Sequence, residues 1–184
     1  MNKAPTLKEG NIILRQPIED DILIREEYGI SSEYAKMIGL NQNKVDNYSY
    51  YDAKKWYQRI LKHPCKWVIE YNNKLIGVVS LRPTTEDQKA KFAIELYDKN
   101  IYGKGFGSKI TEMVLKYAFE VKKYHKVFLR VLDYNTRAIN CYKNCGFIEE
   151  GTDREGALID GKFHSDIYMG ILCSEYKQKN ILNK

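Results

Sequence analysis

The sequence predicts a single α+β domain, and three kinds of pattern lead to that prediction. One long segment has the apolar spacing of an amphipathic helix, several shorter ones are apolar runs typical of strands, and the dipeptides Asn72-Asn73 and Asp160-Gly161 suit hairpin turns. At 184 residues with 43% hydrophobic side chains, the chain is long enough to bury one sizeable core. No internal repeat, linker or low-complexity tract interrupts it, so we expect one domain over 1–173 and a polar tail over 174–184.

The first part of the chain is predicted to open with a strand over 11–16 (Asn-Ile-Ile-Leu-Arg-Gln), which a proline ends. A short helix follows, capped by Asp20 or Asp21 and running through Tyr28 to a glycine. Segment 31–50 is polar and poorly periodic, so a short helix and a mobile loop are expected there.

A second helix is predicted over 52–61, because Trp56, Ile60 and Leu61 fall on one side of it. Pro64 follows as its stop. The next elements are three strands and one polar loop, namely strands over 66–71, 75–82 and 90–97 and a loop over 84–89.

The clearest helix lies over 107–122. Its apolar side chains recur at helical spacing and form one stripe that is expected to face a core, made of Ile110, Met113, Val114, Tyr117, Ala118 and Val121. A strand with alternating side chains follows over 125–132.

A short helix and a hairpin complete the chain. Asn135 is expected to cap the helix, which extends to Asn144 and is ended by Gly146. The hairpin begins at Phe147, turns at the second dipeptide named above and returns over 163–172.

The charge distribution separates one basic region from two acidic ones. The net charge is +6 overall, and residues 99–143 carry ten basic against three acidic side chains. Residues 17–35 carry six acidic side chains against one arginine, and residues 149–166 carry six against two basic ones. The basic region suits an anionic ligand and the acidic regions a cationic one, although solvated protein surfaces also have such charges.

Composition argues against several classes of protein. Cys65, Cys141, Cys145 and Cys173 have no metal-ligand spacing and the three histidines are scattered, so neither a zinc site nor disulfides are expected. No window approaches the ~18 apolar residues that a membrane span requires, and the N-terminus does not read as a signal peptide. The expectation is a cytoplasmic protein that does not act at a membrane.

A glycine-rich turn directly precedes the clearest predicted helix. Gly103, Gly105 and Gly107 allow the backbone to approach a ligand closely, and the helix dipole favours phosphate there. The dinucleotide fingerprint would place its last glycine at Ser108 and an acid ~20 residues on, where Lys123 stands. The lysine of a nucleotide P-loop is also missing, so either another kind of phosphate site or a ligand-free turn is indicated.

Together with segment 135–147, this turn resembles the GNAT-type N-acetyltransferases. The family pattern Gln/Arg-x-x-Gly-x-Gly/Ala falls on 102–107, with Tyr102 departing from it in the Gln/Arg place. The second pattern, Asn-x-x-Ala-x-x-x-Tyr-x-x-x-Gly-Phe, falls on Asn135, Ala138, Tyr142, Gly146 and Phe147. The resemblance covers nearly the whole chain and is greatest to the RimJ/RimL-like subgroup, which includes polyamine and amino-sugar acetyltransferases.

The resemblance implies a GNAT-like three-layer α+β fold, with a central mixed, mainly antiparallel sheet of about seven strands flanked by helices. It implies acetyl-CoA as cosubstrate and no metal, with coenzyme A entering where strand 90–97 separates from strand 125–132. Lys104 and Lys109 are expected to assist at the phosphates. The cofactor-binding residues that it implies are Glu95, Tyr97, Tyr102, Gly103, Lys104, Gly105, Phe106, Gly107, Ser108, Asn135, Ala138 and Tyr142.

By the same resemblance, Tyr142 is the general acid. A phenol of pKa ~10 stays protonated at neutral pH and can donate a hydrogen bond to a leaving thiolate, whose thiol has a pKa of ~8.5. The alternative is that Tyr142 is only a core residue. Many family members carry a carboxylate early in the strand before the glycine turn, where this chain has Ala90-Lys91-Phe92. Glu95 is the only carboxylate in that strand, so it is the candidate base, with a chain of water molecules as the alternative.

The acidic regions would wall the acceptor side in this family, which favours a polyamine or another small cationic amine as acceptor. A protein N-terminus, as in ribosomal-protein acetyltransferases, and an amino sugar are the alternatives, and a homodimer remains open. Two functions of other classes are alternatives, namely a non-catalytic acyl-CoA-binding protein and a nucleic-acid-binding protein. The absence of a nucleic-acid recognition motif and the acidic stretches argue against the second.

Overall fold

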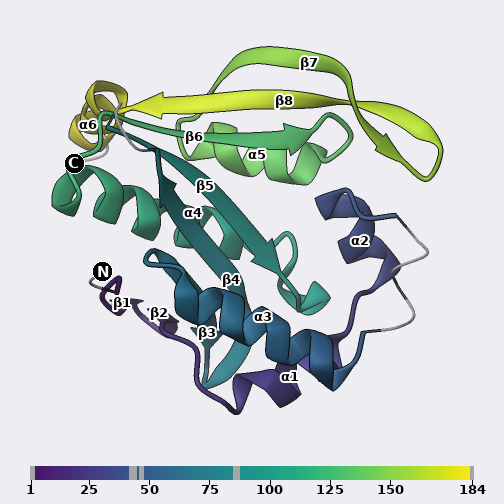
Figure 1. The fold of residues 1–184 in the computed structure, drawn as a ribbon. Helices are drawn as coiled ribbons and strands as arrows, with labels where there is room; N and C mark the ends of the chain where they lie inside the picture. Colours follow the sequence, from purple (N-terminus) through teal and green to yellow (C-terminus); the bar gives the residue numbers. More distant parts are fainter. Residues whose placement is uncertain (1–2, 42–44, 46–47, 85–87, 183–184) are drawn as a thin grey trace. The chain divides into compact units, whose positions relative to one another are not determined.

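The computed structural model describes residues 3–41, 45, 48–84 and 88–182. The mobile loop predicted within 31–50 and the polar loop predicted over 84–89 fall largely on residues outside these ranges. The strands are β1 Leu7–Glu9, β2 Ile12–Arg15, β3 Lys66–Tyr71, β4 Lys74–Pro83, β5 Lys89–Leu96, β6 Lys126–Leu132, β7 Ile148–Ile159 and β8 Lys162–Leu172. The helices are α1 Asp21–Tyr28, α2 Ser32–Ile38, α3 Tyr50–Lys62, the 3-10 turn η2 Lys99–Ile101, α4 Phe106–Lys116, the π-helical turn η3 Tyr117–Val121, α5 Thr136–Asn144 and α6 Cys173–Leu182 (Figure 1).

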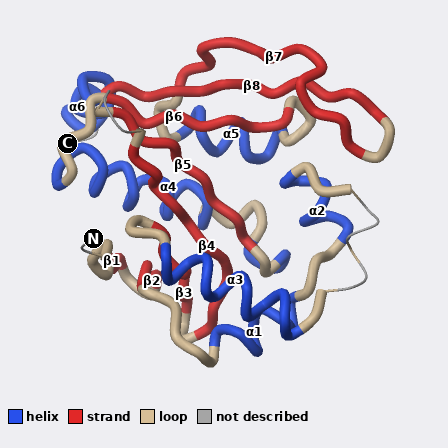
Figure 2. Tube along the Cα trace, in the orientation of Figure 1, coloured by secondary structure: helices blue, strands red, loops and turns tan. Residues whose placement is uncertain are grey.

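The strands are hydrogen-bonded in the order β1-β2-β3-β4-β5-β6-β8-β7 (strands red in Figure 2). β5 and β6 are parallel, whereas the pairs β1–β2, β2–β3, β3–β4, β6–β8 and β7–β8 are antiparallel. The prediction of a mixed, mainly antiparallel sheet is therefore confirmed. Eight strands are described instead of about seven, because the three-residue strand β1 is too short to give a sequence signal.

The parallel pairing of β5 and β6 is brief. It joins Lys89, Ala90 and Lys91 to residues 126–128, although β5 continues to Leu96 and β6 to Leu132. Two strands that continue beyond their shared register leave backbone hydrogen-bonding groups for other partners.

By its internal contacts the chain divides into two compact units, and β4 and β5 pass from one to the other. The first unit comprises residues 1–80 and 94–100. Its core is formed by side chains of α2, α3, β3, β4 and the residue after β5, namely Tyr34, Trp56, Ile60, Val68, Leu75, Val78 and Tyr97. The predicted apolar side of α3 is confirmed at Trp56 and Ile60, whereas Leu61 is only half-buried.

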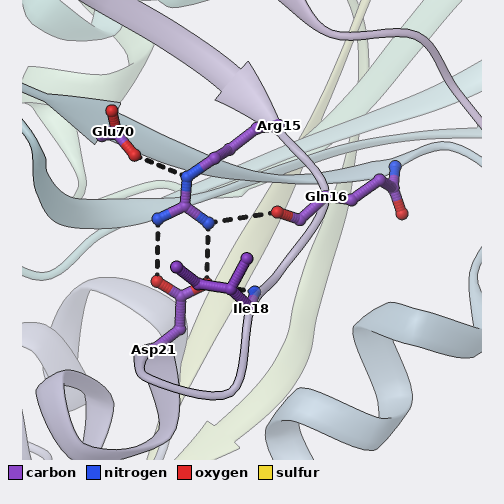
Figure 3. A network of polar contacts seen from close by, with 5 residues as sticks. All are labelled: Arg15, Gln16, Ile18, Asp21 and Glu70. Atoms are coloured by element: carbon purple, nitrogen blue, oxygen red, sulfur yellow. Dashed lines mark hydrogen bonds and ion pairs between the residues drawn. The ribbon is translucent and has the colours of Figure 1, made fainter.

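A buried polar network holds helix α1 against strands β2 and β3 (Figure 3). The Arg15 guanidinium donates to both carboxylate oxygens of Asp21 at 2.8 and 2.9 Å, and its Nε donates to Glu70 at 2.5 Å. Asp21 is fully buried, and its Oδ2 also accepts the amide of Ile18 at 2.8 Å. The predicted side-chain cap by Asp20 or Asp21 is wrong, because the N-cap Asp20 makes no side-chain cap hydrogen bond and the Asp21 carboxylate instead binds Arg15 and the Ile18 amide, which anchors the helix start.

The second unit comprises residues 81–93 and 101–184. The apolar stripe of α4 and the turn after it is buried at Ile110, Met113, Val114, Tyr117 and Ala118. The prediction that Val121 belongs to the same buried stripe is wrong, because its side chain is 63% exposed. The helix ends at Lys116 and continues as the π-helical turn, in which Lys122 N donates to Tyr117 O, so the wider turn rotates Val121 out of the stripe.

The polar tail forms helix α6, which the sequence did not predict. Tyr176 packs its ring on Phe119 with centroids 5.0 Å apart and donates its hydroxyl to Glu120. Lys179 donates to the backbone oxygen of Asn144, at the end of α5. The helix is therefore fixed by side-chain contacts within the second unit rather than by an apolar face of its own.

Candidate functional site

The glycine turn has the backbone conformation that only glycine adopts without strain. Gly103 and Gly105 have φ values of 73° and 81°, in the left-handed region, and Gly105 is the N-cap of α4. A Cβ atom built at either position meets nothing within 4 Å. The backbone conformation thus requires glycine at both positions, and the absence of side chains leaves the backbone open to a ligand.

The start of α4 fits an anionic group. The first amide bonded within the helix is that of Lys109, which donates to Gly105 O at 3.1 Å, so the amides of Phe106, Gly107 and Ser108 precede it. No acidic residue stands in the first turn, and Lys104 and Lys109 are exposed on either side. Backbone amides at a helix N-terminus with flanking cations suit the phosphates of a carrier such as coenzyme A.

Tyr102, which departs from the family pattern, has a defined contact. The guanidinium of Arg137, in the first turn of α5, lies 3.9 Å from the centroid of the Tyr102 ring. The stack places a cation beside the glycine turn although the Gln/Arg side chain of the pattern is missing. Arg137 was not predicted, because this pairing joins residues 35 positions apart.

A cluster of two thiols and a hydroxyl lies behind the same helix start. Cys141 Sγ is 3.4 Å from Ser108 Oγ, and Cys145 Sγ donates to the backbone oxygen of Ser108 at 3.6 Å. A Cβ at Gly107 would approach Cys141 Sγ to 3.1 Å, so the sulfur packs directly against the backbone of the turn. A hydrogen bond from Cys145, followed by those from Ser108 and Thr111, lowers the pKa of Cys141 to about 6. All four cysteines of the chain are free thiols in the structure.

Tyr142 lies on α5 in an aromatic setting. Its ring meets Phe92 edge-on with centroids 6.1 Å apart and Phe147 at 5.8 Å, and its side chain is 8% exposed. Burial, and then the neighbouring thiols, raise the pKa of Tyr142 above its ordinary value. Among the described residues its hydroxyl has no hydrogen-bond partner. The group is therefore a protonated phenol whose donor is not used within the described chain.

Asn135 is the helix cap that the sequence predicts. The side-chain oxygen of Asn135 accepts the Ala138 amide at 3.2 Å, and Asn135 is 8% exposed. The helix ends at Asn144 with Cys145 as its C-cap, and Gly146 follows with φ 96°. The cap fixes the start of the helix that carries Tyr142.

Glu95 and Tyr97 belong to the first unit. The Tyr97 amide donates to Ile76 O at 2.8 Å. The backbone group of Tyr97 that would make the predicted cofactor contact is therefore its carbonyl. The ring of Tyr97 is buried and its hydroxyl accepts Trp56 Nε1 at 2.9 Å. A Cβ at Gly77 of β4 would overlap the Glu95 carbonyl oxygen, so the two strands approach closely at that glycine.

The carboxylate of Glu95 is half-buried and accepts the hydroxyl of Tyr34 at 2.6 Å. Tyr34, from α2, was not predicted as a site residue. The segment that carries it is polar and weakly periodic, and neither spacing nor motif relates it to a strand 61 residues away.

The structure thus divides the predicted residues. Tyr102 to Ser108, Asn135, Ala138 and Tyr142 lie in the second unit, and Glu95 and Tyr97 lie in the first. The described residues hold no group of three or more His, Cys, Asp or Glu side chains arranged to bind a metal. In the same part of the chain, no helix has both the length and the apolar character needed to cross a membrane.

Comparison with known proteins agrees with this arrangement. A spermidine N(1)-acetyltransferase of Vibrio cholerae is 33% identical over 117 residues, which are 62% of this chain and 67% of that protein. The spermidine N(1)-acetyltransferase of Escherichia coli is 28% identical, over 60% of either chain. The crystal structure of the spermidine N-acetyltransferase of Vibrio cholerae in complex with CoA and spermine superimposes with a TM-score of 0.76 at 25% identity, covering 92% of this chain and 99% of that one.

The matches to spermidine acetyltransferase sequences span only about 60 to 67% of those proteins. The family itself is defined more directly, since the model of the acetyltransferase (GNAT) family matches residues 32–147, which include the glycine turn, Glu95 and Tyr142. The prediction of an acetyl-CoA-dependent N-acetyltransferase is confirmed at that level, and the chain belongs to the GNAT acetyltransferase family.

Proposed function

We propose that this protein transfers the acetyl group of acetyl-CoA to a primary amine of a polyamine or of another small cationic amine. The observation that carries the proposal is the pairing, within one compact unit, of an open helix N-terminus with a phenol whose donor is not used. The similarity to spermidine acetyltransferases supports the choice of acceptor.

The residues from Gly103 to Ser108 would hold the pyrophosphate of coenzyme A. The amides of Gly107 and Ser108 supply donors, and Lys104, Lys109 and Arg137 supply positive charge around them. Acetyl-CoA supplies the thioester and its thiolate leaving group. The remaining chemistry falls to side chains of this chain.

Tyr142 would donate a hydrogen bond to the sulfur as the thioester breaks. Its raised pKa keeps the phenol protonated, so no prior proton transfer is needed. Complete proton transfer to a thiolate is uphill for a phenol, so stabilisation of the developing negative charge is its role. As the neutral amine nitrogen bonds to the acetyl carbon, the carbon–sulfur bond breaks, and the proton that the nitrogen then loses balances the charge of the coenzyme A thiolate that leaves.

Glu95 would receive the proton that the ammonium group loses before attack, directly or through water. A primary alkylamine is protonated at neutral pH, since its pKa is ~10.4, and must lose a proton before attack. Glu95 is a half-buried carboxylate and the only acid of β5. Its role as the base is testable by Glu95→Gln, which retains shape and hydrogen bonding but cannot accept the proton.

The acidic segments would favour a cationic acceptor. In the second unit, the exposed acids of strand β7 (Glu149, Glu150, Asp153 and Glu155) form one such surface. A negative surface raises the local concentration of a polyamine and slows an anionic acceptor, and salt weakens both effects.

The test is release of coenzyme A against three acceptors at low and high salt, using spermidine, an alanine-terminated peptide and an amino sugar. Spermidine is expected to have the highest kcat/KM, and added salt is expected to reduce that value. A preference for the peptide or the amino sugar, unchanged by salt, would contradict the acceptor proposed here while leaving acetyl transfer itself intact.

We also propose that the protein belongs to the RimJ/RimL-like subgroup, which the sequence pattern supports. We propose a cytoplasmic location, which the cysteine usage supports. We further propose that residues 1–173 act together as one acetyltransferase domain.

A further inference from the structure

The hydrogen bond from Tyr34 to Glu95 joins a helix to the strand that carries the proposed base. The Tyr34 hydroxyl donates to Oε2 of Glu95 at 2.6 Å, and both residues belong to the first compact unit. The second carboxylate oxygen, Oε1, has no partner among the described residues. One oxygen is therefore held, and the other is left for a proton.

Tyr34 is held in place on several sides. The Ser31 side chain caps α2 by accepting the Tyr34 amide at 3.2 Å, and the tyrosine side chain is 6% exposed. Its ring meets Tyr97 edge-on, with centroids 5.5 Å apart, and Tyr97 is in turn fixed by the hydrogen bond from Trp56. A phenol so constrained gives its partner carboxylate one position rather than several.

The electrostatic setting makes Tyr34 a donor only. Burial, followed by Tyr97 and Glu95, raises the pKa of Tyr34 far above its ordinary value, so it stays neutral throughout the working range. The other charged or titratable groups facing this pair are Arg25, Tyr48 and Tyr97. The Arg25 guanidinium lies 4.1 Å from the Tyr48 ring centroid, 4.4 Å from that of Tyr97 and 5.9 Å from that of Tyr34.

We infer that Tyr34 is a positioning residue that holds the Glu95 carboxylate in the orientation needed to take the amine proton. The inference rests on the proposed function, in which Glu95 receives that proton. Tyr34 acts through Glu95 and needs no contact with the acceptor.

The chain offers a matched control in Tyr28. Its ring also packs on Tyr97, at 5.9 Å, and its hydroxyl also makes one hydrogen bond, but to the backbone oxygen of Leu75 at 3.0 Å. Tyr34→Phe and Tyr28→Phe each remove one hydroxyl from the same aromatic cluster, so a general loss of stability affects both variants.

The experiment measures kcat and KM for spermidine in the wild type, Tyr34→Phe, Tyr28→Phe and Glu95→Gln, with KM for acetyl-CoA recorded in each. Loss of a hydrogen bond to a charged group is worth ~1.5 kcal/mol, so kcat of Tyr34→Phe is expected to fall about tenfold. KM for acetyl-CoA should be unchanged in that variant. Tyr28→Phe should keep the wild-type kcat.

Two outcomes would count against the inference and are distinguishable. If Glu95→Gln lowers kcat while Tyr34→Phe keeps the wild-type kcat, Glu95 is the base and Tyr34 does not position it. If Glu95→Gln keeps the wild-type kcat, the base assignment in the proposed function is wrong, and the inference is wrong with it.

Discussion

The glycine turn and the tyrosine cluster around Glu95 are built in opposite ways. The turn at the start of α4 uses backbone amides and two left-handed glycines, all within a short run of sequence. The cluster uses side chains of α1, α2, α3 and the end of β5, brought together by folding. A local backbone site shows in the sequence as a motif, whereas a site of distant side chains does not, and the two should respond differently to substitution.

The largest effect is expected from removing the hydroxyl of Tyr142, which is the proposed hydrogen-bond donor to the leaving sulfur. Tyr142→Phe retains the packing on Phe92 and Phe147 and loses only the hydroxyl. Turnover is expected to fall by about ten- to a thousand-fold, the range for one acid or oxyanion-type contact, with little change in acetyl-CoA affinity. Steady-state rates with isothermal titration of acetyl-CoA measure both quantities. A fully active variant would make Tyr142 a core residue.

The second-largest effect is expected on the free energy of unfolding, when the buried carboxylate of Asp21 is replaced in the unit that also contains the tyrosine cluster. Asp21→Asn keeps the size of a fully buried side chain but leaves Arg15 facing a neutral amide. Breaking one partner of a buried ion pair costs about 3 kcal/mol, which urea unfolding would detect. Glu112→Gln, which disrupts the exposed contact with Lys179, is the control and should change stability by less than about 1 kcal/mol. Equal losses in the two variants would mean that the buried network contributes no more than a surface pair.

The glycine turn itself should respond through binding. Gly105→Val places a β-branched side chain at φ 81° in the path of the phosphates, so KM for acetyl-CoA is expected to rise about tenfold or more. Gly161→Val is the matched control, since Gly161 has φ 74°, also meets nothing within 4 Å, and lies in the β7–β8 turn. Comparable increases in KM for both variants would show a general effect of strain and would refute the phosphate site.

The smallest effect is expected in the pH dependence of alkylation of Cys141, whose thiol packs against the glycine turn. The lowered pKa of Cys141, about 6, means that its thiolate is present above that pH, whereas an ordinary thiol of pKa ~8.5 is largely protonated at neutral pH. Alkylation of Cys141 by iodoacetamide, followed by peptide mass analysis, should therefore persist near pH 6.5 while alkylation of free cysteine added to the same solution declines. A parallel decline of both would place the Cys141 pKa in the ordinary range.

The sequence predicted what local patterns encode. Asn72 and Asn73 have φ values of 49° and 61°, as the hairpin requires, and strand β3 has the predicted bounds. The cap at Asn135 and the turn at Gly161 were also predicted. Each of these depends on the conformational preference of one or two residues, which is why sequence reasoning reached them.

What sequence reasoning missed depends on contacts between distant residues. The stack of Arg137 on Tyr102, the bond from Tyr34 to Glu95 and the docking of α6 through Tyr176 each join side chains far apart in the chain. The π-helical turn that exposes Val121 likewise follows from packing, since the residues over 117–121 suit an α-helix equally well. Local propensity contains no information on such pairings.

Gly77 has a consequence for sequence variation. Its Cα faces the carbonyl oxygen of Glu95 with no room for even one methyl group, and it has an ordinary backbone conformation rather than a left-handed one. Exchange for alanine would therefore force β5 away from β4 at the residue that carries the proposed base. In a saturation library selected for acetylation, position 77 should return glycine alone, although neither its side chain nor its φ angle takes part in the chemistry.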